Sequence, residues 1–504
     1  MNELEQTRGE LVEQKLLARV HPVDWQSPEP ADRYHLVVVG AGTAGLVSAA
    51  GAAGLGARVA IVEQARMGGD CLNTGCVPSK ALLSAARIAE VVRKSTAFGI
   101  ERTGPVQVDF RAVMERMRAL QAELAAPDSA RRFQQLGVDV FFGNGSFTSH
   151  NSVDVGGVQL RFKKGVIATG TRPAVPPVPG LESVHYLTNE TIFSLTELPK
   201  RLAIIGGGPV GCELAQAFVR FGSEVYLIES SSSILPREER DAADLVAKAL
   251  KRDGVHLLCS AKHLNVSQTS SGIKVTLSSN EKHHEVNVDH LLVAAGRVAN
   301  VEQLGLEKAG VAYDQQSGVV VNDRLQTTNR KIYAAGDVCS KYKFTHAADA
   351  MARIVIGNSL FGKRDRFSRL IFPWCTYTSP EIARVGLSQQ EADAAKIPID
   401  TYTQPLADID RAVLDGYSEG FIRVHVRRGS AKILGATIVA ERAGELIGEI
   451  TQAMTHRLSL KDLSSTIHPY PTVGAGISKI GDQYNRTRLT PLVKGLLAKW
   501  FAWR

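Results

Sequence analysis

The feature that most constrains this chain is a glycine-rich turn between two apolar strands, and it occurs twice. The first copy carries Gly40, Gly42, Gly45 and Glu63. Its glycines follow the valine run 37–39, and its acid follows the strand-like run 58–62, eighteen residues after the third glycine. Glycines here let a pyrophosphate reach the N-terminus of the next helix, and the acid can bind a ribose diol. The pattern predicts a strand, turn, helix and strand that bind a dinucleotide.

The second copy repeats this spacing. It carries Gly206, Gly208, Gly211 and Glu229, between the apolar runs 202–205 and 225–228. The acid again follows the third glycine by eighteen residues, and two matching copies are improbable by chance. The sequence therefore predicts an α/β chain with two Rossmann-like dinucleotide-binding domains.

A pair of cysteines follows the first copy. Cys71 and Cys76 are separated by four residues within the glycine-rich stretch 68–80, which ends in Lys80. A cysteine that opens a helix is favoured as thiolate by the helix dipole, and a lysine one turn later adds a positive charge. Such a thiolate can attack a disulfide, bind a soft metal or exchange electrons with a flavin. Two cysteines at this spacing could also form a structural disulfide or stay reduced in a core, but the dinucleotide context favours a redox-active disulfide.

Three further apolar segments end in small-residue turns, at 167–170, 294–297 and 333–337. With these motifs, residues 34–485 resemble the FAD-dependent pyridine nucleotide-disulfide oxidoreductases, the group of glutathione reductase, dihydrolipoamide dehydrogenase and mercuric reductase. The resemblance implies an enzyme in which NADH, or NADPH, reduces FAD and the flavin reduces the disulfide. It also implies a homodimer.

The resemblance assigns roles to individual residues. It implies an FAD site formed by Gly40, Gly42, Gly45, Glu63, Gly69, Lys80, Gly143, Thr169, Gly170, Gly336, Asp337, Thr345 and His346. It implies a nicotinamide cofactor site formed by Gly206, Gly208, Gly211, Glu229 and Gly296. Cys76 would face the flavin, Cys71 would meet the substrate, and Lys80 would pair with Glu213.

Domain boundaries follow from the same motifs. We expect an N-terminal extension and linker at 1–33, FAD-binding parts at 34–180 and 298–366, an NAD(P)-binding domain at 181–297, an α+β dimerisation domain at 367–485 and an amphipathic tail at 486–504. In the dimerisation domain, strands at 421–426 and 433–439 precede a helix at 443–456.

Composition excludes several other classes. The net charge of +8 is scattered along the 504 residues, so we predict no nucleic-acid partner. Apart from the first pair, the six cysteines are dispersed, which favours a reducing cytoplasm over a secreted disulfide framework. The sequence shows no signal peptide, no apolar run long enough to span a bilayer and no resident metal site.

One segment departs from the disulfide-reducing relatives. They carry a histidine before Pro-Thr and a glutamate five residues later, and this dyad exchanges protons with a substrate thiol. Here Tyr470 and Ala475 occupy the two positions. His468 could substitute, but no carboxylate stands at the family's position to orient it. A phenol is a poor proton shuttle at neutral pH, so we expect weak activity toward lipoamide and glutathione disulfide.

Tyrosine at this position resembles mercuric reductases, in which Hg(II) passes between thiolates. Those enzymes also use a C-terminal cysteine pair, and here no cysteine follows Cys375. We therefore predict a mercuric-reductase-like enzyme in which Hg(II) binds transiently at Cys71 and Cys76. Alternatives are an NADH:quinone-type reductase, a small-disulfide reductase or a non-catalytic flavin redox sensor. Glu229 favours NADH, because a carboxylate repels the 2'-phosphate of NADPH.

The last residues form an apolar helical stripe at 492, 493, 496, 497, 500 and 501, with Lys494 and Lys499 away from its centre. Such a helix could lie on an anionic membrane surface or pack on its own dimer. We expect a cytoplasmic protein that could be peripheral at the inner face of the membrane.

Overall fold

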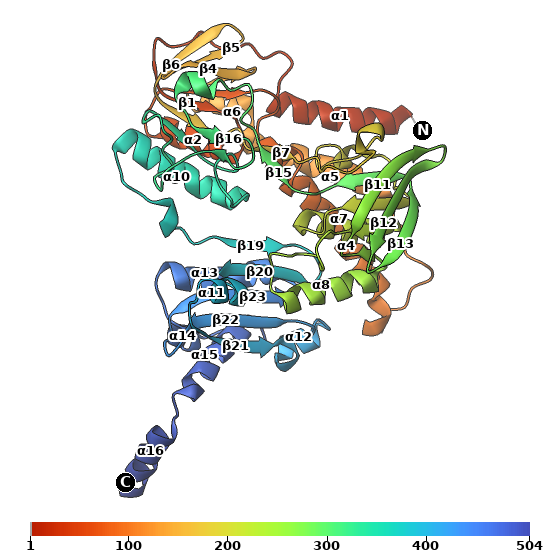
Figure 1. Cartoon of the computed structure of the whole chain (residues 1–504), viewed down its shortest axis with the longest axis vertical. Helices are drawn as coiled ribbons and strands as arrows, with labels where there is room; N and C mark the ends of the chain where they lie inside the picture. Colours follow the sequence, from red (N-terminus) through yellow and green to blue (C-terminus); the bar gives the residue numbers. More distant parts are fainter. Residues whose placement is uncertain (1–2) are drawn as a thin grey trace.

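A seven-stranded sheet forms the core of the first nucleotide fold in the computed structural model, which describes residues 3–504 (Figure 1). Its strands are β1 (Tyr34–Val39), β2 (Val59–Glu63), β3 (Val138–Phe142), β4 (Gly145–Ser149), β5 (Ser152–Val155), β6 (Val158–Ile167) and β18 (Ile332–Ala334). β1 lies at the centre, parallel to β2 and β6, and both of its faces are covered. Parallel strands buried on both faces need continuous apolar runs, which explains the valines of β1.

The core on one face of this sheet is lined by α2 (Thr43–Gly54), α6 (Ala130–Gln135), α10 (Thr345–Phe361) and the last turn of α5 (Phe110–Leu124). α2 packs along α10, and the close approach needs a small residue, because a Cβ on Gly51 would lie 2.6 Å from Ile356 Cδ1. The short elements α9 (Leu306–Ala309), β16 (Tyr313–Asp314) and β17 (Gly318–Val319) complete the returning segment.

The second nucleotide fold has a parallel sheet in the order β10-β9-β8-β14. Its main elements are β8 (Arg201–Ile205), α7 (Pro209–Phe221), β9 (Glu224–Ile228), α8 (Arg240–Asp253), β10 (His256–Leu258) and β14 (His290–Val293). An antiparallel meander of β11 (Lys262–Thr269), β12 (Gly272–Ser279) and β13 (Lys282–Val288) is inserted before β14. β7 (Thr171–Pro173) pairs with β15 (Arg297–Ala299), so the chain leaves and re-enters the first fold through one two-stranded ribbon.

The C-terminal domain is a five-stranded antiparallel sheet in the order β19-β20-β23-β22-β21. Its strands are β19 (Pro373–Thr376), β20 (Glu381–Gly386), β21 (Ile399–Pro405), β22 (Phe421–Arg427) and β23 (Ile433–Ala440). Its helices are α11 (Gln389–Ala394), α12 (Asp410–Leu414), α13 (Ala443–Thr455), α14 (Leu460–Ser464) and α15 (Ala475–Thr487). The predicted strands at 421–426 and 433–439 and the helix at 443–456 are confirmed as β22, β23 and α13.

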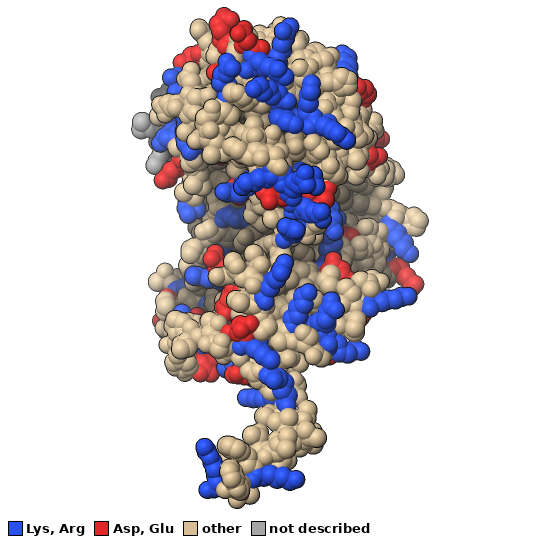
Figure 2. Space-filling model, turned by 90° about the vertical axis from the view of Figure 1, so that its left-hand side faces the viewer, with Lys and Arg blue, Asp and Glu red and all other residues tan. Residues whose placement is uncertain are grey.

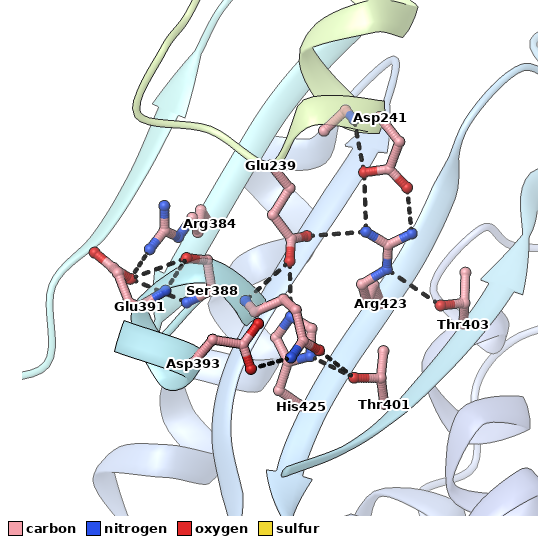
Figure 3. A network of polar contacts seen from close by, with 12 residues as sticks. Glu239, Asp241, Arg384, Ser388, Glu391, Asp393, Thr401, Thr403, Arg423 and His425 are labelled. Carbon is pink, nitrogen blue, oxygen red and sulfur yellow. Dashed lines mark hydrogen bonds and ion pairs between the residues drawn. The ribbon is translucent and has the colours of Figure 1, made fainter. Parts of the chain in front are cut away.

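A polar network fastens this domain to the second nucleotide fold (Figure 3). Glu239, at the start of α8, contacts His425 Nε2 at 2.9 Å and Arg423 at 3.1 Å, both from β22. Arg423 also binds Asp241. Burial opposes the charge on Glu239, but its hydrogen bond to His425 and the nearby charges lower its pKa to about 2. The network therefore fixes the relative position of the two domains.

The N-terminal extension packs on the first fold. α1 (Glu3–Val20) contacts α5, and its side chains at Leu16 and Val20 are buried. In the segment predicted as a linker, Trp25 Nε1 donates a hydrogen bond of 3.1 Å to the Val140 carbonyl of β3. The extension therefore adds a layer to the fold and is anchored along an edge strand.

The C-terminal helix, unlike the N-terminal extension, projects from the molecule. α16 (Pro491–Trp503) projects from the C-terminal domain beyond α15 (Figure 1). Across the described part of the chain, no helix combines the length and apolar character needed to cross a bilayer.

Candidate active site

Two helix N-termini lie at the predicted phosphate sites. α2 begins after Gly42 and α7 after Gly208, so backbone N–H groups of both helices face the end of a central strand. A Cβ at Gly208 would meet no atom within 4 Å, and at Gly42 the nearest would be Gly69 Cα at 3.8 Å. The protein's own packing therefore does not require glycine at either position. The free space fits a pyrophosphate that approaches the backbone closely.

The other motif glycines are required by packing. A Cβ at Gly45 would lie 1.8 Å from the Gly40 carbonyl oxygen, and one at Gly211 would lie 1.9 Å from the Gly206 carbonyl oxygen. These glycines let each helix contact its strand. Each fold thus has one motif glycine with free space around it and one that helix–strand contact requires.

The two motif acids make equivalent contacts. Glu63 accepts hydrogen bonds of 2.8 Å from the backbone N–H groups of Ala41 and Ala65. Glu229 accepts hydrogen bonds of 2.7 Å from those of Gly207 and Ser231. Each carboxylate therefore lies beside its glycine turn, where a ribose would follow the pyrophosphate.

Their proton affinities differ. Burial raises the pKa of Glu63 despite its two backbone hydrogen bonds. Burial also opposes the charge of Glu229, but hydrogen bonds from the Ser231 and Gly207 N–H groups lower its pKa overall. Glu229 is the more firmly ionised of the two.

The cysteine pair lies where two short elements meet. α3 (Gly69–Asn73) carries Cys71, and α4 (Cys76–Arg93) begins at Cys76. Cys76 Sγ lies 3.4 Å from Thr345 Oγ1 at the start of α10. Its hydrogen bond from Cys71, another from Thr345 and the charge of Lys80 outweigh burial and lower the pKa of Cys76 to about 6. The pKa of Cys71 is raised, because its thiol donates to Cys76 and is itself buried.

Lys80 links the two nucleotide folds. Its Nζ on α4 lies 2.8 Å from Glu213 Oε2 on α7, and 4.7 Å from the ring centroid of Tyr377. The other Glu213 oxygen accepts a hydrogen bond of 2.9 Å from the Tyr377 N–H. Glu213 is buried, so the lysine supplies the countercharge that a buried carboxylate needs.

A second network connects the cysteine helix to the end of β18. Asp70 forms an ion pair with Arg297 and accepts a hydrogen bond of 3.0 Å from Asn189. Arg297 Nε also donates to Thr171 Oγ1 at 2.7 Å, and Thr171 donates to Asp337 at 3.1 Å. Burial raises the pKa of Asp337, although Arg297 opposes the shift. The network holds the cysteine helix in register with the strand ends of the first fold.

The remaining predicted cofactor residues lie in turns after strands. Gly143 follows β3 and donates its N–H to the Glu63 carbonyl at 2.9 Å. Thr169 and Gly170 both bind Asn300, through a side-chain hydroxyl and a carbonyl. Left-handed backbone occurs at Gly69, Gly143, Gly170, Gly296 and Gly336. His346 stands one residue after Thr345, and its Nε2 lies 2.7 Å from the Pro373 carbonyl oxygen.

The segment that departs from the disulfide reductases lies in the C-terminal domain. Tyr470 is 80% exposed and its hydroxyl donates to Asp410 at 2.9 Å, a hydrogen bond that raises the pKa of the phenol. Ala475 begins α15. His468 does have a carboxylate partner, contrary to the sequence expectation, because its Nε2 lies 3.0 Å from Glu449 Oε2 on α13. Its Nδ1 lies 3.2 Å from the Thr466 carbonyl oxygen.

Comparisons with known proteins agree with this architecture. The sequence model described as pyridine nucleotide-disulphide oxidoreductase matches residues 34–352, and the dimerisation-domain model of that family matches 372–479. The chain belongs to this family. It is 33% identical to a mercuric reductase of Lysinibacillus sphaericus, over 88% of this chain and 82% of that protein. It is 34% identical to a dihydrolipoyl dehydrogenase of Chlamydia muridarum, over 88% and 95%.

A solved structure gives the same result. The Cu(II) complex of the HOCl-induced flavoprotein disulfide reductase RclA from Escherichia coli superposes with a TM-score of 0.79. The two chains are 30% identical, over 90% of this chain and all of that one. The protein is therefore a pyridine nucleotide-disulfide oxidoreductase that uses FAD and NAD(P)H, and its dimerisation domain supports a homodimer. The predicted domain boundaries stay predictions.

Some contacts of the site were not predicted from the sequence. Tyr377 is distant in the chain from Lys80 and carries no motif of its own. Asp70 and Arg297 both stand in segments that the sequence singled out, as the residues next to Cys71 and Gly296, but nothing local indicated that they meet. Thr345 was expected beside FAD, and its contact with Cys76 gives it a second role.

Proposed function

We propose that the protein is a mercuric-reductase-like enzyme, which passes two electrons from NADH to a thiophilic metal ion held by Cys71 and Cys76. With Hg(II) the reaction balances as NADH + Hg(II) → NAD⁺ + Hg(0) + H⁺. When bound, FAD would supply the transfer of electrons from the nicotinamide to the metal ion that the reduced cysteine pair holds. Gly42, Gly208 and the two motif acids would hold the cofactors.

The observation that carries the proposal is a paired thiol site without an acid–base dyad. Cys76 is held as a thiolate by Cys71, Thr345 and Lys80, and a thiolate is the form that binds a soft metal. Reducing a disulfide substrate also requires a proton for the leaving thiolate. Asp410 raises the pKa of Tyr470, which makes this phenol a weak acid and a poor proton donor to the thiolate. Metal reduction at the thiols needs no such donor.

The contact between His468 and Glu449 favours a second candidate, reduction of a small disulfide. A histidine beside a carboxylate is a common proton shuttle. Here, however, both ring nitrogens face acceptors inside their own domain, and the side chain of His468 is 12% exposed. This arrangement leaves no ring nitrogen for a substrate, so we assign the pair a structural role.

The two candidates differ in steady-state assays of the flavin-loaded dimer. We expect Hg(II)-dependent NADH oxidation that is lost in Cys71→Ser and Cys76→Ser, and little turnover of lipoamide or glutathione disulfide. The expected deficit against a dyad-bearing relative is about 10²- to 10⁴-fold. Anaerobic NADH titration should show uptake of more than two electrons per subunit and a long-wavelength thiolate band that Cys76→Ser abolishes.

The matched variants separate the outcomes further. Tyr470→His with Ala475→Glu restores the family's two side chains and should raise disulfide turnover without raising metal reduction. His468→Gln should leave both reactions unchanged if the His468–Glu449 pair is structural. Disulfide turnover at rates typical of dyad-bearing relatives, lost in His468→Gln, would overturn the proposal. Quinone reduction that persists in both cysteine variants would instead support the quinone alternative.

A further inference from the structure

The projecting tail presents an apolar surface that no described part of its own chain covers. None of the residues of α16 is buried, and Leu492, Phe501 and Trp503 are 73%, 70% and 81% exposed. An exposed group of large apolar side chains on this scale marks an interaction surface. Thr490 caps the helix by accepting from the Val493 N–H, so α16 forms a defined helix although nothing covers it.

Large and small side chains lie on different sides of α16. At about 100° per residue, the large apolar side chains fill roughly half of the circumference. They are Leu492, Val493, Leu496, Leu497, Trp500, Phe501 and Trp503. Lys494 and Lys499 fall at the two edges of this half, and the opposite side carries the small residues Pro491, Gly495, Ala498 and Ala502. Lysines at the edges of an apolar face can extend to lipid headgroups while the face is buried.

The charge of the tail indicates which kind of partner α16 binds. After Asp482 the chain has no acidic residue, whereas Arg486, Arg488, Lys494, Lys499 and Arg504 are basic. Figure 2 shows these charges as blue atoms at the tail, with no red atoms on the visible face of its projecting part. A partner that is apolar inside and negatively charged at its surface matches this pattern, and an anionic phospholipid bilayer has both properties.

We propose that α16 docks the enzyme on an anionic membrane surface, with its axis in the plane of the headgroups and its two tryptophans at the interface. The helix has 13 residues, fewer than the roughly 20 needed to cross a bilayer, so it lies on the membrane. Trp500 and Trp503, whose ring centroids are 6.1 Å apart, would enter the headgroup boundary together. This inference is independent of the electron acceptor.

The test is flotation of the full-length, flavin-loaded dimer with two kinds of vesicle, phosphatidylcholine alone and phosphatidylcholine with about one third phosphatidylglycerol. We expect binding to the anionic vesicles only, weakened by salt, with a blue shift of tryptophan emission. Trp500→Ala with Phe501→Ala should weaken binding by about tenfold or more, and Lys494→Gln with Lys499→Gln by roughly threefold to tenfold. Ala498→Ser with Ala502→Ser, on the opposite side of α16, is the matched control and should bind like the parent.

Equal recovery with both vesicle types, or no flotation at all, would overturn the proposal. The competing occupant is the partner protomer. In that case truncation after Thr487 would weaken the dimer in sedimentation equilibrium, and anionic vesicles would leave the tryptophan emission of the full chain unchanged. None of these measurements depends on enzyme turnover, so failure here is distinguishable from failure of the proposed metal reduction.

Discussion

The two nucleotide folds start from the same sequence fingerprint but hold their ligand turns differently. In the first fold the turn is packed against the cysteine helix, since a Cβ on Gly69 would lie 2.6 Å from Gly42 Cα. In the second fold the turn is open, and Gly208 has free space around it. The fingerprint is common to both folds, and the packing around the turn differs between them.

The largest expected effect is the loss of stability when a glycine required for helix–strand packing is replaced. Gly45→Ala forces Cβ to within 1.8 Å of the Gly40 carbonyl oxygen, and we expect a destabilisation of about 3 kcal/mol or more and loss of bound flavin. Gly42→Ala meets nothing closer than 3.8 Å, so unfolding after flavin removal should change by less than about 1 kcal/mol while FAD affinity falls. Guanidinium unfolding and FAD titration measure the two effects. Equal loss of stability in both variants would contradict the division of roles.

In the second fold, substitution of the turn glycine should weaken cofactor binding without changing stability. Gly208→Ala places a methyl group in the space that we assign to the pyrophosphate, and the KM for NADH should rise by roughly 10- to 100-fold. Flavin content and stability should stay at the parent values. Gly54→Ala, another helix position with free space and no place in a motif, is the control and should leave the KM unchanged. An unchanged KM in Gly208→Ala would show that the cofactor does not approach this turn.

How far the sequence predicts this site depends on how local each contact is. The glycine turns, the acids and the cysteine pair follow from backbone geometry within short segments, so they could be predicted. The contact of Cys76 with Thr345 joins residues 269 positions apart, and that of His468 with Glu449 joins the loop between α14 and α15 to α13. Such contacts depend on how complete elements pack. The docking of α1 was missed for a related reason, because only a few apolar side chains, such as Leu16 and Val20, interrupt its polar pattern.

The motif acids of the two folds should differ in their effect on the choice between NADH and NADPH. Because backbone N–H groups keep Glu229 ionised beside the open turn, the parent enzyme should prefer NADH to NADPH. Glu229→Gln keeps the size of the side chain and removes its charge, so the ratio of kcat/KM for NADPH to that for NADH should rise by about tenfold. Glu63→Gln, the matched change in the first fold, should leave this ratio alone. A parent enzyme with higher efficiency for NADPH would show that the serines at 230–233 govern the choice instead.

The smallest expected effect concerns the site where the two folds meet, and it is a shift in a titration midpoint. Since the pKa of Cys76 is lowered to about 6, its thiolate should persist above that pH and be lost as the pH falls through it. Alkylation of Cys76 in the reduced enzyme, followed by peptide mass spectrometry, should therefore show a midpoint near 6. Removing each stabilising partner should raise the midpoint, most in Cys71→Ala, less in Thr345→Val and least in Lys80→Met, by about one pH unit or less in the last. If Lys80→Met gave the largest shift, the charge shared between α4 and α7 would control the thiolate, and the hydrogen bonds within the first fold would be secondary.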